Sequence, residues 1–123
     1  MTNDELLDLA LQARKNARTS ICDFKVGSAL LAKNGEVFLG CNIQDPSGIG
    51  ITNICAERLA IAKALSEGQD EFEKIAVVGE DGKECLPCGA CLQYINSFAP
   101  RIKIITIHKE YSLSELLPMA FNL

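Results

Sequence analysis

The sequence lacks any apolar run long enough to cross a membrane, any internal repeat and any low-complexity tract. It also lacks an excess of positive charge, because 12 Lys and Arg residues face 16 Asp and Glu residues, for a net charge of −4. Proteins that bind nucleic acid gather basic side chains on one face, where they displace counterions from phosphates. We therefore expect no membrane partner and no nucleic-acid polymer as partner.

The N-terminal residues lack the basic start of a secretory signal and carry acidic side chains instead. We therefore expect a cytoplasmic protein. A length of 123 residues, 48% of them hydrophobic, is typical of a single domain over residues 1–123 with a real core. In a reducing compartment, the six cysteines indicate metal binding or catalysis rather than disulfide bonds.

The spacing of apolar residues predicts alternating helices and strands. An amphipathic helix is expected from a cap at Thr2 or Asn3 to Ala17, a buried helix over Ile54–Ser66, a helix that begins at Pro87, and a short turn that begins at Ser112 or Ser114. Strands are expected over Phe24–Leu31, Glu36–Cys41, Lys74–Gly79 and Ile102–Ile107. This alternation predicts an α/β fold, a layered sandwich with a mixed central sheet.

Two shorter segments connect these elements. Asn34-Gly35 is the dipeptide that favours positive φ angles in a tight hairpin turn. Residues 44–52 contain Pro46, Gly48 and Gly50, and they are expected to form a loop.

Two fragments carry the chemistry: Cys55-Ala56-Glu57 and Pro87-Cys88-Gly89-Ala90-Cys91. Cysteines three residues apart lie on one face of a helix, so Cys88 and Cys91 can reach the same ion. With Cys55 at the start of its own helix, three thiolates would leave the fourth position of a tetrahedral zinc open, as in catalytic sites. The N-terminal ends of helices favour the thiolate form that binds metal.

Glu57 lies two residues beyond Cys55, where a carboxylate can take a proton from a water at the open position. A non-ligand glutamate beside three such ligands is the pattern of zinc deaminases. A structural zinc or plain buried cysteines are the alternatives, but neither requires a glutamate in an otherwise apolar helix start.

On these motifs the sequence resembles the small, homotetrameric, zinc-dependent cytidine deaminase family along nearly its whole length. Further resemblance lies in Phe24-Lys25-Val26-Gly27-Ser28-Ala29-Leu30-Leu31, in Gly40-Cys41-Asn42-Ile43 and in Leu116-Leu117-Pro118-Met119-Ala120-Phe121. The resemblance implies a three-layer α-β-α sandwich, one Zn²⁺ per subunit and hydrolytic deamination of cytidine or deoxycytidine in pyrimidine salvage.

The resemblance also implies roles for single residues. The substrate contacts are Phe24 at the pyrimidine, Ala56, Asn42 and Gln44 at the ribose, and Phe121 from a neighbouring subunit. Arg58 offsets the charge of the three thiolates. From the residues alone, the two phenylalanines could instead be core aromatics, Asn42 could cap its own backbone, and Arg58 could be a solvated helix charge.

The sequence departs from the family around the sugar. Gln44 stands where the family has a glutamate, residues 45–53 form a longer loop without the customary tyrosine, and Leu92 stands where an arginine is common. Two alternatives therefore stay open: deamination of another cytosine-like compound, such as a nucleoside antibiotic or a modified base, and a non-catalytic zinc-binding module.

The other candidate ligands are weaker. Cys85 could complete a closed four-thiolate site or an iron–sulfur cluster, but it precedes Pro87 and is expected on the loop, pointing elsewhere. Cys22 and Cys41 are interpreted as small buried hydrophobic residues. His108-Lys109-Glu110 matches half of a deaminase signature, but it follows a strand and is expected at the surface.

Overall fold

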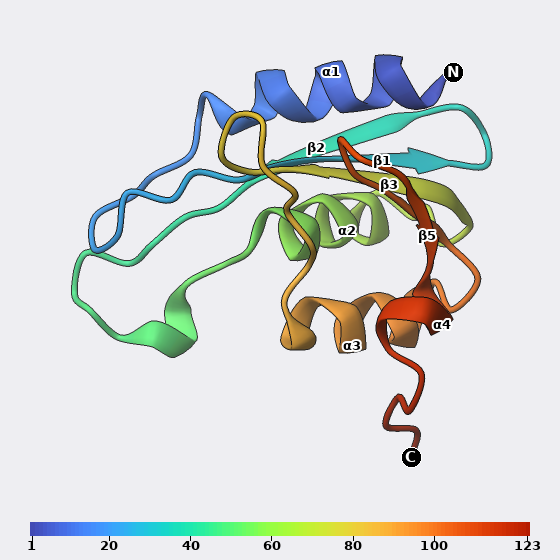
Figure 1. Cartoon of the computed structure of the whole chain (residues 1–123). Helices are drawn as coiled ribbons and strands as arrows, with labels where there is room; N and C mark the ends of the chain where they lie inside the picture. Colours follow the sequence, from blue (N-terminus) through green and yellow to red (C-terminus); the bar gives the residue numbers. More distant parts are fainter.

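The computed structural model describes residues 1–123, and a five-stranded sheet forms its centre (Figure 1). The strands are β1 (Gly27–Ala32), β2 (Val37–Cys41), β3 (Phe72–Val78), β4 (Lys103–Ile105) and β5 (Glu110–Ser112). The helices are α1 (Asn3–Arg14), α2 (Ala56–Ser66), α3 (Gly89–Phe98) and α4 (Leu113–Leu116), with a 3₁₀ turn η1 over Gly50–Thr52. No helix combines the length and the apolar character that a membrane span requires.

The sheet is mixed, as the sequence predicted. Its strand order is β2-β1-β3-β4-β5. Strand β1 pairs antiparallel with both β2 and β3, β3 pairs parallel with β4, and β4 pairs antiparallel with β5. The parallel pair requires a crossover between β3 and β4, and α3 lies in that crossover.

Helices cover both faces of the sheet, so that the fold has three layers (Figure 1). Alternate residues of β1 show the arrangement: Leu30 belongs to the core shared with α2 and α3, whereas Ala29 and Leu31 belong to the core under α1. All six residues of β1 are buried, as expected for a strand covered on both sides. The predicted three-layer α-β-α sandwich is confirmed.

Local sequence signals explain several helix ends, and two of the caps are among the predicted ones. Thr2 caps α1 in a capping box with Glu5, and Ser112 caps α4 in the same way with Glu115. Gly68, with φ of 86°, follows the end of α2.

Other boundaries differ from the prediction. Strand β1 begins at Gly27 rather than at Phe24, and α3 begins at Gly89, so that Pro87 lies outside the helix and Cys88 caps it. Strand β5 and η1 were not predicted. The helix that was expected to reach Ala17 ends at Arg14.

The hairpin between β1 and β2 forms at the predicted place with a different geometry. Gly35 has φ of 95°, but no residue other than glycine has a positive φ. Asn34 therefore has an ordinary φ, and the turn uses one left-handed residue rather than two. The Gly35 N–H donates to the Ala32 carbonyl at 3.0 Å.

Gly40 in β2 lets α2 approach the sheet closely. A Cβ atom at Gly40 would lie 2.1 Å from the Ala56 carbonyl oxygen and 2.8 Å from the Ala60 nitrogen. Only a residue without a side chain fits between β2 and the first turn of α2. That turn holds Glu57 and follows Cys55, so Gly40 sets the distance of both from the sheet.

We predict that Gly40→Ala destabilises the fold by about 1–3 kcal/mol, because α2 must move away from β2 to admit the methyl group. Urea denaturation measures the loss. Gly50→Ala is the matched control, because a Cβ atom at Gly50 meets nothing within 4 Å. Equal midpoints for the two variants would contradict the role of Gly40.

Candidate functional site

Three cysteines meet where the first turns of α2 and α3 converge. Cys55 caps the N-terminus of α2, Cys88 caps that of α3, and Cys91 lies in the first turn of α3. In Figure 1 the two helices lie on the same side of the sheet, with their first turns at the same end. The sulfur atoms of the three cysteines all lie within 4.8 Å of one another, and those of Cys88 and Cys91 are 3.5 Å apart.

This donor set fits a metal ion. Thiolates are soft ligands suited to zinc, and three of them leave one tetrahedral position for water or substrate. Cys85 is not part of the cluster. Its side chain packs with Val26, Ala56 and Val77, and burial raises the pKa of its thiol to about 11. The group is therefore a three-thiol site, as the sequence predicted, rather than a four-thiol one.

The surroundings of Cys55 favour its thiolate. The Cys91 thiol donates a hydrogen bond to it and the Arg58 guanidinium lies beside it, which together lower the pKa of Cys55 to about 5. The same hydrogen bond raises the pKa of Cys91, because the Cys91 thiol keeps its proton as the donor to Cys55. Burial raises the pKa of Cys91 as well. These surroundings favour the thiolate form at Cys55 among the three sulfurs.

Arg58 holds this charge from its own helix. Its Nη2 donates to Cys55 Sγ at 3.5 Å and to the Asn53 carbonyl at 3.4 Å. The side chain is therefore not a solvated helix charge, although Nε has no hydrogen-bond partner. Its position agrees with the predicted role of offsetting thiolate charge.

Glu57 is the one buried carboxylic acid of the chain, with 4% of its surface exposed. Burial and, to a smaller extent, the nearby Cys55 raise the pKa of Glu57 to about 7. A carboxyl group that titrates near neutral pH can both accept and return a proton. Because Glu57 lies in the first turn of α2 with Cys55 as its cap, acid and sulfurs share one end of the helix.

Comparison with known proteins agrees with this site. Residues 1–108 match the family model described as the cytidine and deoxycytidylate deaminase zinc-binding region. The chain belongs to this family. Zinc is accordingly the metal for the three cysteines, all of which lie within the matched residues.

Individual relatives cover the chain from end to end. A protein of Halalkalibacterium halodurans named cytidine deaminase is 41% identical over 99% of this chain and 96% of its own. The crystal structure of cytidine deaminase from Burkholderia pseudomallei matches with a TM-score of 0.90 at 37% identity, over 98% of this chain and 100% of that one. The cytidine deaminase structure from Mycobacterium tuberculosis has a TM-score of 0.90 at 30% identity, over 100% and 99%.

The two phenylalanines of the predicted deaminase site are exposed rather than part of the core. Phe24 is 44% exposed and Phe121 is 69% exposed. The Phe121 backbone is held by Gln93 of α3, through one hydrogen bond to its N–H and one to its carbonyl. Figure 1 shows the C-terminal tail extending below α3 and α4, away from the sheet. Exposure leaves both rings free to contact a substrate or another subunit.

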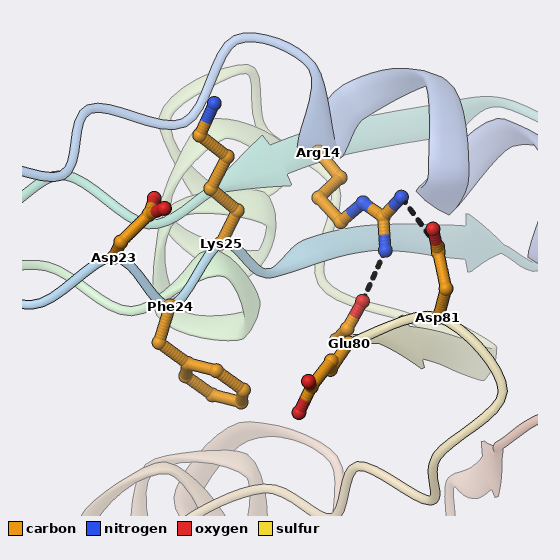
Figure 2. Close-up of a pocket in the computed structure, with 7 residues that line it drawn as sticks. Arg14, Asp23, Phe24, Lys25, Glu80 and Asp81 are labelled. Atoms are coloured by element: carbon orange, nitrogen blue, oxygen red, sulfur yellow. Dashed lines mark hydrogen bonds and ion pairs between the residues drawn. The ribbon is translucent and has the colours of Figure 1, made fainter.

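Phe24 also borders a pocket of about 410 Å³ between α1, the segment before β1 and the end of β3 (Figure 2). The side chains that Figure 2 labels there are mostly charged: Arg14, Asp23, Phe24, Lys25, Glu80 and Asp81. None of the three thiols and no part of Glu57 lines it. The pocket is therefore separate from the metal cluster.

Asn42 and Gln44, the predicted ribose contacts, both bind backbone of the chain itself. Asn42 Oδ1 accepts from the Val26 N–H at 2.8 Å, and its Nδ2 donates to the Phe24 carbonyl at 2.7 Å. Gln44 binds the backbone of residues 20–22 in a similar way. The alternative that Asn42 hydrogen-bonds to the backbone is therefore confirmed. Its second amide hydrogen remains available for a contact with a ligand.

The longer loop that follows is closed by its own polar side chains. Asp45 accepts a hydrogen bond from the Thr52 hydroxyl and one from the Ser47 N–H, which lower the pKa of its carboxyl group. Asn53 Oδ1 accepts from the Asp45 N–H at 2.6 Å. Ile49 and Ile51 project from this loop, 57% and 92% exposed.

The remaining sequence predictions have mixed outcomes. Cys22 is exposed and Cys41 only partly buried, so the interpretation of both as buried residues is wrong. Cys22 lies in the exposed segment before β1, and the sequence pattern did not indicate that this segment is exposed. His108 is a surface residue, as predicted, with Nδ1 3.9 Å from Glu84 Oε2.

Sequence reasoning missed two residues that support the site. Asn53 supplies the carbonyl that orients Arg58, and no local pattern indicates such a contact. Gly40 could have been found, because a glycine within a strand often marks a close approach of another backbone.

We predict that Cys88→Ala lowers bound zinc from one ion per chain to nearly none, because two thiols are too few to hold the ion in this geometry. Elemental analysis of the purified variants measures it. Cys85→Ala is the matched control and should keep the metal, since Cys85 lies outside the cluster. Loss of zinc from both variants would indicate a closed four-thiolate site.

Proposed function

We propose that this protein catalyses the hydrolytic deamination of cytidine or deoxycytidine to the uridine nucleoside and ammonia. The observation that carries the proposal is the convergence of three thiols beside a buried carboxyl group, that of Glu57. The names of the relatives reported above support the choice of substrate. A non-catalytic zinc module has no use for that carboxyl group.

The roles of the residues follow from their positions. When bound to Cys55, Cys88 and Cys91, zinc supplies a Lewis acid that lowers the pKa of a water from 15.7 to about 7. Glu57 takes a proton from the water that adds to C4 of the pyrimidine. It passes that proton to the ring nitrogen N3, and then carries the second proton from the new C4 hydroxyl to the amine, so that C4 becomes a carbonyl and ammonia leaves. Arg58 reduces the charge that the three sulfurs place on the metal.

We further propose that Phe24 and Ala56 contact the base and that Asn42 and Gln44 lie at the sugar end. Ala56 lies between Cys55 and Glu57, and it packs with Val26, two residues from Phe24. The base would therefore lie beside the acid and the metal.

A different cytosine-like substrate is the second candidate. The Gln44 carboxamide has no negative charge and its oxygen already binds the backbone, so it cannot bind a sugar hydroxyl as a free carboxylate can. A panel of cytosine compounds with altered sugars distinguishes the candidates, since a preference for one of them over cytidine would select it.

We predict that the zinc-loaded protein releases ammonia from cytidine and that Glu57→Gln lowers kcat by about 10²–10⁴-fold while zinc content is kept. Glutamine preserves the shape of the side chain but cannot accept or return the proton. Absorbance of the pyrimidine and an ammonia assay measure the rate.

Glu73→Gln serves as the control, because Glu73 is an exposed residue of β3. It should leave kcat unchanged. An inactive wild-type protein with full zinc would refute cytidine as substrate, and full activity in Glu57→Gln would refute the role of the acid.

We also propose that each chain is a single domain over residues 1–123 and that four chains form a homotetramer. One sheet takes strands from Gly27 to Ser112, and α1 packs on it, which supports the single domain. The exposed apolar residues of the C-terminal tail support association: Met119 at 89%, Phe121 at 69% and Leu123. Phe121 would then reach the site of a neighbouring subunit.

The expected mass in solution is about four times the 13.3 kDa of the chain, measured by light scattering. Association buries apolar surface that the single chain exposes. Phe121→Ser should weaken the tetramer, whereas Phe98→Ser, at a 43% exposed ring outside the tail, should not. A monomer at micromolar concentration would overturn this proposal.

The proposed setting is pyrimidine salvage in the cytoplasm. All six cysteines are free, which suits a reducing compartment. Growth of a pyrimidine-requiring strain on cytidine tests the salvage role, and cell fractionation tests the location.

A further inference from the structure

The segment that leads into β1 is held by very few contacts. Residues 20–25 are all exposed, so no buried side chain fixes them. Every hydrogen bond that ties residues 19–25 to the rest of the chain is made to Asn42 or Gln44. The position of this segment therefore depends on two residues that follow β2.

Gln44 makes most of these bonds. Its Oε1 accepts from three successive backbone N–H groups: Ser20 at 3.0 Å, Ile21 at 2.8 Å and Cys22 at 3.1 Å. Its Nε2 donates to the Cys22 carbonyl at 2.8 Å. A carbonyl oxygen has two lone pairs, so an oxygen with three donors has no acceptor capacity left for a ligand.

Asn42 continues the same contact toward β1. It binds the Phe24 carbonyl and the Val26 N–H, on either side of Lys25. The two amide side chains thus hold the backbone on both sides of Phe24. In an extended chain, residues two apart point to the same side, which explains how Asn42 and Gln44 act on one segment.

The segment in turn places an aromatic ring at the edge of the site. Figure 2 shows the Phe24 ring and the Lys25 side chain pointing to opposite sides of the segment. Phe24 Cζ lies 3.3 Å from where a Cβ atom of Gly79 would be, and the Cys85 side chain lies against the same point. Cys85 packs with Ala56, which lies beside Glu57. The ring therefore lies on the side of Cys85, which packs against the cluster that contains Ala56.

We infer that Gln44 is a positioning residue, which sets Phe24 against the nucleoside base by holding residues 20–22, rather than a direct contact to the sugar. This inference rests on the proposed function in taking the base as the partner of Phe24. The inference explains why this position holds glutamine rather than glutamate. The Gln44 amide N–H donates to the Cys22 carbonyl, and a carboxylate has no such donor.

Amide hydrogen exchange without substrate tests the holding of the segment. Gln44→Met keeps the side-chain length and removes both the acceptor and the donor, so the Ser20, Ile21 and Cys22 amides should exchange about tenfold faster or more. Gln44→Glu keeps the acceptor oxygen but loses the donor to the Cys22 carbonyl, so these three amides should exchange faster than in the wild type and more slowly than in Gln44→Met. Gln69→Met is the matched control, because Gln69 makes one side-chain hydrogen bond, of 3.4 Å, to Glu36.

A double-mutant cycle on kcat/KM for cytidine tests the route to the substrate. Gln44→Met should lower kcat/KM about tenfold, mainly through KM, in the wild-type chain and less than about twofold in a Phe24→Ala chain. Zinc content is measured in all four proteins and should be equal.

Unchanged exchange in Gln44→Met would overturn the inference, and so would faster exchange in Gln44→Glu than in Gln44→Met. Equal losses of kcat/KM with and without Phe24 would also overturn it, because they indicate a direct sugar contact. If the wild-type protein does not act on cytidine, the proposed function fails, and the exchange result still decides whether Gln44 holds the segment.

Discussion

The structure depends on bringing three sulfur atoms within 4.8 Å of one another. Thiolates so close repel each other, and the fold offsets this repulsion with helix ends and one arginine. Two of the sulfurs belong to helix caps and the third to a first helical turn, where partial positive charge from unpaired backbone N–H groups favours anions. Arg58 adds a full positive charge. Bound zinc neutralises the remaining negative charge of the three sulfurs, so metal binding and folding of the two helix ends are coupled.

That convergence in turn requires a close approach of α2 to the sheet. Gly40 admits the first turn of α2 to within contact of β2, and the small residues Ala60 and Ala64 continue the fit along the helix. The same approach buries Glu57, and burial brings its pKa near neutrality. One packing constraint therefore serves the metal, through Cys55, and the proton transfer, through Glu57.

Sequence reasoning succeeded where the signal is local and failed where it is not. The spacing of Cys88 and Cys91 and a helix cap at Thr2 or Asn3 are short-range predictions, and the structure confirms the cysteine pair and places the cap at Thr2. The start of β1 was placed too early because the polar groups of residues 20–25 bond to side chains about twenty residues away rather than to a neighbouring strand. Strand β5 has three residues, too few for an alternating pattern to be recognised.

Apart from Leu92, which follows Cys91 in α3, the departures of this chain from its family lie in loops rather than on the helices that carry the cysteines. The three cysteines, Glu57 and Arg58 are fixed by helices that pack on the sheet. Gln44 and residues 45–53 belong to loop segments whose hydrogen bonds are made mostly among themselves and with residues 18–22, apart from the bond between the Asn53 carbonyl and Arg58. A change at Gln44 or in residues 45–52 can alter which nucleoside binds while the helices that carry the cysteines and Glu57 stay in place. Because exposed loops tolerate substitution better than packed helix starts, variation in this enzyme should fall on substrate choice before it falls on the deamination step.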